Sequence, residues 1–181
     1  MNVFIAGPRA ISSFDQDVQN RLYSIYKNEH TVIVGDANGV DKSVQKFFFE
    51  LQYQNVMVFA CDGNARNNIG NWEIENVPVD KKLKGFDFYQ QKDIAMSNYA
   101  DYGFMIWNGE SKGTFNNILN LIANGKKVLT YFVPKKDFIL VSDNTDLENL
   151  LKLCPYKTLE LYKELIKKKP KENIQLSIFD V

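Results

Sequence analysis

The sequence predicts an α/β fold, a Rossmann-like three-layer sandwich with a mostly parallel sheet and C-terminal helices. Short, nearly continuous apolar runs of strand length recur along the 181 residues, as is usual for strands buried on both faces. Amphipathic stretches of helical length separate most of these runs, which is typical of helices that cover both faces of a sheet through right-handed crossovers. We therefore expect one domain over residues 1–170, followed by a tail at 171–181.

Each element follows from a local pattern. The expected strands are the apolar runs at 2–6, 31–35, 55–60, 102–107 and 127–132, with a further short strand at 138–142. The expected helices lie at 15–28, 40–52, 87–99, 114–124, 145–153 and 158–169. The segment 61–86 is too long and too polar for an ordinary connection. Its Trp72 and clustered asparagines predict an ordered loop.

The composition argues against some kinds of active site but does not indicate a binding partner. The 22 basic and 22 acidic residues balance, so net charge indicates no particular partner. No apolar run is long enough for a membrane span, the N-terminus has no signal-peptide pattern, and Cys61 and Cys154 indicate free thiols. We therefore expect a cytoplasmic protein with no membrane contact. The single histidine, His30, leaves little material for a metal site or a Ser-His pair, and we expect neither metal nor cofactor.

Three glycine-bearing turns follow expected strands, at 6–13, 35–42 and 108–117. The carboxyl ends of parallel strands meet at one sheet edge, where ligands of open α/β sheets bind. Glycine lets backbone N–H groups approach a ligand, and a helix N-terminus attracts anions, so the turns predict a phosphate site. The alternative for any single turn is that its glycine serves chain geometry alone. The expected ligand-binding residues are Gly7, Arg9, Gly35, Asp36, Asn38, Gly39, Lys92, Asn108, Gly109, Ser111, Lys112, Gly113, Thr114 and Asn117.

Individual polar residues in this set admit two interpretations each. Asp41 is expected to cap a helix or complement its dipole, whereas Asp36 fits a ribose hydroxyl or base contact. Arg9 fits a phosphate, with a surface salt bridge as the alternative. The Arg-Asn-Asn run at 66–68 could close over a ligand or belong to a mobile loop. Trp107 could stack on a base or fill the edge of the core.

Three motifs together resemble the SLOG superfamily: FIAGPR at 4–9, GDANGVD at 35–41 and KDIAMSNYADYGFMIWNGESKGT at 92–114. This Rossmann-like group includes the LONELY GUY phosphoribohydrolases and the DNA-processing protein A domain, and the second motif looks most like its YspA-like branch. The resemblance covers residues 2–133. It implies a sheet of order 3-2-1-4-5, a nucleotide-derived ligand across the first and fourth strand ends, and a homodimer.

The resemblance fails at the catalytic residue. Where the phosphoribohydrolases resemble PGGxGTxxE, the glutamate position falls here on Asn116 or Asn117, and Lys92 occupies the arginine position. An asparagine amide cannot act as a base or stabilise an oxocarbenium-like centre by charge. We therefore expect a nucleotide-binding protein. The alternative is an N-glycosidic-bond hydrolase using Glu110, Asp36 or Asp93, which a resemblance of IAGP to nucleoside deoxyribosyltransferases keeps open.

The C-terminal QLSIF resembles the short peptide by which bacterial DNA-metabolism proteins bind the replicative sliding clamp. In such a peptide Gln175 would hydrogen-bond while Leu176, Ile178 and Phe179 fill apolar pockets, and the preceding lysines would draw the tail toward DNA. The alternative is that this segment packs on its own domain. A third hypothesis is therefore a DNA-metabolism accessory protein of a bacterium or phage, recruited by its tail.

Overall fold

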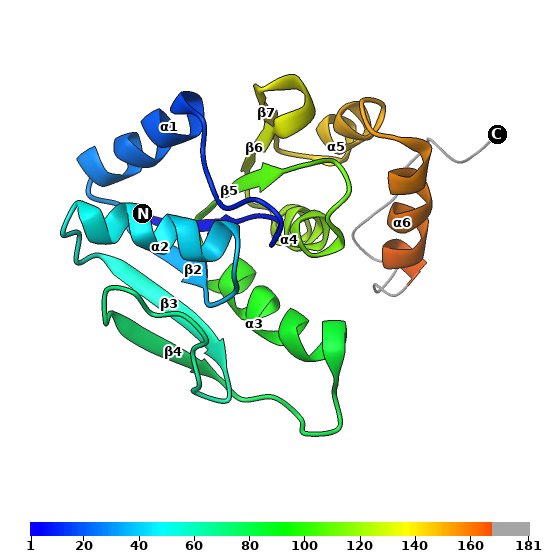
Figure 1. The fold of residues 1–181 in the computed structure, drawn as a ribbon. Coiled ribbons are helices and arrows are strands. Elements are labelled where there is room, and N and C mark those ends of the chain that lie inside the picture. The colour runs from blue at the N-terminus through cyan, green and yellow to red at the C-terminus, as the bar shows by residue number, and fades with distance from the viewer. Residues whose placement is uncertain (168–181) are drawn as a thin grey trace.

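The structure, a computed structural model, describes residues 1–167 and places a mixed sheet between two layers of helices (Figure 1). The strands are β1 (Asn2–Ala6), β2 (Thr31–Gly35), β3 (Val56–Cys61), β4 (Glu73–Val77), β5 (Tyr102–Trp107), β6 (Val128–Phe132) and β7 (Asp137–Val141). The helices are α1 (Gln16–Lys27), α2 (Val40–Glu50), α3 (Gly85–Tyr99), α4 (Lys112–Ala123), α5 (Asn144–Leu151) and α6 (Tyr156–Lys167), with a short 3₁₀ turn at Val133–Lys135.

The strands pair in the order β4-β3-β2-β1-β5-β6-β7. All neighbours are parallel except β6 and β7. Within this sheet, β3-β2-β1-β5-β6 reproduces the expected order 3-2-1-4-5, so the Rossmann-like prediction is confirmed. The sheet differs in one detail, because an additional strand, β4, extends it beyond β3.

The apolar side chains of the inner strands divide between two cores. In β1, Val3 and Ile5 pack in the core under α1 and α2, whereas Phe4 and Ala6 pack in the core under α3 and α4. This alternation is the period of two that a strand imposes on its side chains. Because both faces of β1 are buried, the run is apolar throughout, which is why the sequence pattern located it so well.

The expected loop at 61–86 is ordered, but it contains a strand that its composition did not predict. Trp72 anchors the segment just before β4, since its indole Nε1 donates to the carbonyl of Tyr53 at 2.8 Å. Asn68 adds two hydrogen bonds to the backbone of Trp72, at 2.8 and 3.0 Å. β4 then pairs with the outer edge of β3, and four of its five side chains are exposed. A strand with this little burial carries no apolar signal.

Two other observations complete the fold. Of the helices in residues 1–167, none combines the length and apolarity needed to cross a membrane. The possible clamp-binding residues, Gln175, Leu176, Ile178 and Phe179, lie outside the described residues.

Candidate functional site

A cavity of about 480 Å³ opens at the carboxyl ends of the strands. Its wall comes from the turn after β1, the start of α2, the loop after β3, one face of α3 and the first turn of α4. Seven of the predicted ligand-binding residues line it: Gly7, Arg9, Lys92, Ser111, Gly113, Thr114 and Asn117. The lining also includes Asp41, Arg66, Phe86, Tyr89, Gln90 and Asp93. The other seven predicted residues do not line it: Gly35, Asp36, Asn38, Gly39, Asn108, Gly109 and Lys112.

The first turn of α4 forms one end of the cavity. Ser111 caps the helix, accepting from the backbone N–H of Thr114 at 3.4 Å, while the Thr114 hydroxyl donates to Ser111 Oγ at 3.0 Å. A side chain at Gly113 would meet no atom within 4 Å. Asn117, one turn further, is 4% exposed, and its Oδ1 has no hydrogen-bond partner. Ser111 thus caps the helix, whereas the backbone at Gly113 borders the open space of the cavity, and a helix N-terminus in such a position favours anions.

The polar side chains of the turn before α4 contact the turn itself and α6 rather than the cavity. Asn108 Oδ1 accepts from the backbone N–H groups of Glu110 and Ser111, at 3.2 and 2.9 Å, so this side chain holds the turn itself. Lys112 reaches Glu164 of α6 at 3.4 Å, and Thr158 of α6 donates its hydroxyl to the carbonyl of Gly109. These contacts fasten the turn to the C-terminal helix.

Glu110, one of the three candidate catalytic carboxylates, does not reach the cavity. It is exposed and lines a separate groove beside α6, together with Lys112, Lys157 and Glu164. The neighbouring Trp107 is fully buried and stacks on Phe115 with ring centroids 5.2 Å apart, so the core interpretation of this tryptophan is the correct one.

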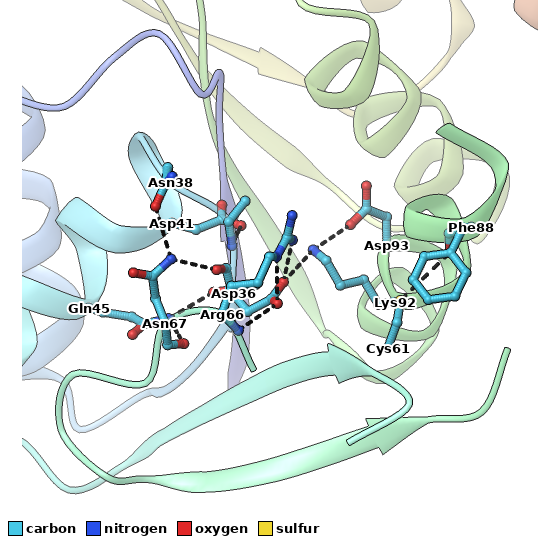
Figure 2. Close-up of polar contacts among 12 residues, drawn as sticks. Asp36, Asn38, Asp41, Gln45, Cys61, Arg66, Asn67, Phe88, Lys92 and Asp93 are labelled. Carbon is cyan, nitrogen blue, oxygen red and sulfur yellow. Dashed lines mark hydrogen bonds and ion pairs between the residues drawn. The ribbon is translucent and has the colours of Figure 1, made fainter. Parts of the chain in front are cut away.

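Asp36 is engaged within the protein rather than open to a sugar (Figure 2). Its carboxylate accepts from the backbone N–H, Nε and Nη2 of Arg66 at 3.1, 2.9 and 2.6 Å. Asn67 continues the attachment, donating to the Asp36 carbonyl at 2.8 Å and to Asn38 Oδ1 at 3.1 Å. Burial acts to raise the pKa of Asp36, but the hydrogen bonds from Arg66 and the charge of Lys92 outweigh it and hold the pKa below its usual value. Asp36 and Asn38 thus secure the loop after β3.

Lys92 lies at the centre of three carboxylates (Figure 2). Its Nζ is 3.0 Å from Asp93 Oδ1 and 3.9 Å from Asp36 Oδ1, and Asp41 acts on it by charge. Burial alone would lower the pKa of Lys92, but the three acids together raise it. Gly35 completes the arrangement, since a Cβ there would lie 2.4 Å from Asp41 Oδ2 and 2.6 Å from Lys92 Nζ. Gly35 therefore serves close packing.

Asp41 is not the N-cap of α2, but it lies in the first turn of this helix, where an acid complements the helix dipole. The N-cap of α2 is Gly39, whose φ of +78° suits glycine and which makes no side-chain cap hydrogen bond. A Cβ at Gly39 would also lie 2.4 Å from the carbonyl oxygen of Arg9, so this glycine serves close approach of two turns. The Asp41 carboxylate accepts from the backbone N–H of Ala37 at 3.2 Å. Burial raises the pKa of Asp41 to about 6, although Lys92 opposes this.

Two arginines meet one tyrosine at the cavity wall. The guanidinium of Arg66 lies 4.3 Å from the centroid of the Tyr89 ring, and that of Arg9 lies 5.4 Å from it. Arg66 is already neutralised by Asp36, whereas Arg9 forms no ion pair with any other residue in 1–167. Sequence reasoning missed Phe86 and Tyr89. Both share a helical face with Lys92, Asp93 and Met96 at spacings of three and four, a signal that could have found them.

Within the described part of the chain, no group of three or more His, Cys, Asp or Glu side chains is arranged to hold a metal ion. The three aspartates around Lys92 hold an ammonium group instead. The site therefore offers hydrogen-bond donors, an arginine, aromatic rings and buried carboxylates.

The fold and the cavity define a Rossmann-like protein with a candidate ligand site at the carboxyl ends of its strands. No protein-family model and no curated protein matches the sequence. Among solved structures, the chain is similar to DNA processing protein A from Helicobacter pylori, described for its unique single-stranded DNA binding mode. The TM-score is 0.56 at 12% identity, over 94% of this chain and 82% of that chain. This likeness supports the Rossmann-like fold.

Proposed function

We propose that the protein binds a nucleotide or nucleotide-derived ligand, such as a nucleoside phosphate, ADP-ribose or NAD-like molecule, in the cavity at the strand ends. The observation that carries the proposal is the α4 N-terminus at Gly113, which borders a cavity of about 480 Å³. Pockets for small molecules commonly range from about 300 to 1,000 Å³. Arg9, which lines the same cavity and has no ion-pair partner within residues 1–167, adds a free cation.

The lining divides into two chemical parts. A phosphate would accept a hydrogen bond from the backbone N–H of Gly113 and pair with Arg9. A base or ribose would lie along α3, where Phe86 and Tyr89 supply aromatic surface and Gln90 supplies an amide. The chemistry of the lining thus matches a ligand that is anionic at one end and flat and partly apolar at the other.

Thermal unfolding with a panel of nucleoside phosphates, ADP-ribose and NAD tests the proposal. A ligand at 100 times its Kd stabilises the folded state by about 2.7 kcal/mol, which is easily measured. The Arg9→Ala variant should lose most of the shift, whereas Glu110→Ala, which removes a charge outside the cavity, should retain it. If no compound in the panel raises the Tm of the wild-type protein, the proposal is wrong.

A second candidate function is binding of single-stranded DNA in a DNA-metabolism role. The similarity to DNA processing protein A favours it, and an unpaired Arg9 beside aromatic side chains suits a nucleic-acid strand as well as a free nucleotide. Fluorescence anisotropy with a labelled oligonucleotide at low and moderate salt would test it. Affinity that falls with salt and with Arg9→Ala supports it, and unchanged anisotropy contradicts it. Retention on an immobilised sliding clamp, lost in Phe179→Ala, would test the role of the tail separately.

The hydrolase alternative also has a specific observation in its favour. Asp93 and Asp41 line the cavity, so two carboxyl groups border the space in which a nucleotide would lie. A carboxyl group could protonate a leaving base or activate water at an N-glycosidic bond. Incubation with nucleoside monophosphates and chromatography for free base tests this activity. Absence of free base after incubation with a nucleotide that binds would dispose of it.

A further inference from the structure

Five charged groups from three parts of the chain lie together (Figure 2), and four of them, all but Asp36, line the cavity. Asp36 follows β2, Asp41 lies in the first turn of α2, Arg66 lies in the loop after β3, and Lys92 and Asp93 lie on α3. Three carboxylates therefore face two cations. The nearby thiol of Cys61, at the end of β3, contacts the carbonyl of Phe88 at 3.6 Å and adds no charge of its own.

Within this cluster the negative charge is least compensated at Asp41, and Arg9 adds a third cation to the cavity lining. Asp36 has the guanidinium of Arg66 at 2.6 Å, and Asp93 has the ammonium of Lys92 at 3.0 Å. Asp41 has no ion pair within 4.0 Å among residues 1–167, and its carboxylate accepts one backbone N–H, from Ala37. It is also 6% exposed and lines the cavity. Among the three acids, it is the one for which a proton would relieve most repulsion.

We infer that Asp41 takes up a proton when an anionic ligand binds in this cavity. The affinity of the protein for that ligand therefore increases as the pH falls from 8 toward 6. This inference rests on the proposed function and specifies how the same site is regulated.

The direction follows from linkage. Burial already raises the pKa of Asp41 to about 6, so in the free protein the group is mostly ionised at pH 8 and half protonated near pH 6. A bound phosphate adds negative charge and raises that pKa further. The complex then holds more protons than the free protein between the two pKa values, and the affinity falls as pH rises through that window. Below about pH 5 both states carry the proton and the affinity levels off.

The pKa directions of two neighbouring groups favour Asp41 as the site of uptake. Arg66 holds the pKa of Asp36 below its usual value, and the three acids hold the pKa of Lys92 above its usual value. Neither group therefore titrates between pH 6 and 8. The lone histidine, His30, precedes β2 and so lies at the amino ends of the strands, whereas the cavity lies at their carboxyl ends.

Isothermal titration calorimetry of the full chain with ADP-ribose and NAD, whose phosphate diesters do not titrate between pH 6 and 8, measures this coupling. Titrations in two buffers of different ionisation enthalpy give the number of protons taken up. We expect uptake of about half a proton per site near pH 7 and an affinity about sevenfold tighter at pH 6 than at pH 8. A single charge about 10 Å away at an effective dielectric constant of about 20 is sufficient for that change.

Asp41→Asn is the decisive variant, because the amide keeps an acceptor for the Ala37 N–H but cannot take up a proton. It should bind with an affinity that no longer depends on pH and with no proton uptake. Glu110→Gln, the same change outside the cavity, should behave as the wild-type protein. Binding without proton uptake, or pH dependence that persists in Asp41→Asn, would overturn the inference while leaving the proposed function intact. Absence of binding of both compounds at every pH would overturn the inference through the proposed function on which it rests.

Discussion

Two turns at the same sheet edge, both rich in glycine and both predicted to bind a ligand, have opposite fates in the fold. The turn between β2 and α2, here called the closed turn, contacts other parts of the protein, since Asp36 pairs with Arg66 and Gly35 packs against Lys92. The start of α4, here called the open turn, is instead accessible to a ligand, because Gly113 faces open space. A glycine turn therefore indicates either close packing or ligand access. The partners that decide between them come from distant parts of the chain.

The largest effect is expected from removing the acid that holds the closed turn. Asp36→Ala leaves Arg66 and the buried Lys92 without this partner, and loss of one member of a buried ion pair costs about 3–5 kcal/mol. A fall in Tm of about 10 °C is expected by thermal denaturation. Glu110→Ala should change the Tm little. An Asp36→Ala variant with normal stability and lost nucleotide binding would contradict the structural role of this turn, since Asp36 would then be a ligand contact.

Asp41 follows the closed turn but also borders the cavity, so its substitution affects folding and binding separately. Its folded-state pKa of about 6 lies above the ordinary 3.8, so the folded protein holds more protons between these values and loses stability as the pH rises through them. Asp41→Asn removes that loss. The variant should exceed the wild-type protein by about 3 kcal/mol in free energy of unfolding at pH 7, and the difference should vanish below about pH 4. Urea denaturation at both pH values measures it, and an Asn variant less stable at pH 7 would contradict the prediction.

Alanine at Gly35 should destabilise the closed turn. The new methyl group would lie 2.4 Å from Asp41 Oδ2 and 2.6 Å from Lys92 Nζ, so both buried groups would have to move. Overpacking of this kind costs about 1–3 kcal/mol. Chemical denaturation would show it as a lower midpoint, and an unchanged midpoint would mean that the buried charges rearrange freely.

Alanine at Gly113 is the matched change at the open turn, with the smallest expected effect on folding. No atom lies within 4 Å of the added methyl group, and alanine is the better helix former, so stability should stay equal or rise by up to about 1 kcal/mol. The methyl group borders the cavity, so nucleotide affinity should fall. Calorimetry on a protein of full stability separates the two effects, and full affinity in this variant would remove α4 from the proposed site.

Most of the fold was predictable because its strands are buried on both faces. Runs such as those of β1 and β5 are apolar at nearly every position, and their limits in the structure agree with those expected. β4 was not predictable, since its residues alternate acidic, apolar and amide side chains that remain exposed. It forms because β3 offers an unpaired parallel edge and Trp72 holds the chain beside it.

The site was predictable only in part. Gly113, Ser111 and Thr114 could be placed on the cavity because a helix start after a strand fixes where they lie. Asp36 and Arg66 are 30 residues apart, separated by α2 and β3, and no local pattern specifies their pairing. The cavity position of Asp41 depends on the positive φ of Gly39, which sets the direction from which α2 begins. Tertiary contacts of this kind are not encoded in residue type or spacing.

The exposed strand β4 has a consequence for how copies of this chain meet one another. It is an outer strand of the sheet, and an unpaired edge is a template on which another chain can add. A second copy that paired at this edge would meet the exposed carboxylates of Glu73 and Glu75. Like charges placed directly opposite oppose such pairing. We therefore expect the acidic residues that make β4 hard to recognise in the sequence to disfavour edge-to-edge pairing as well.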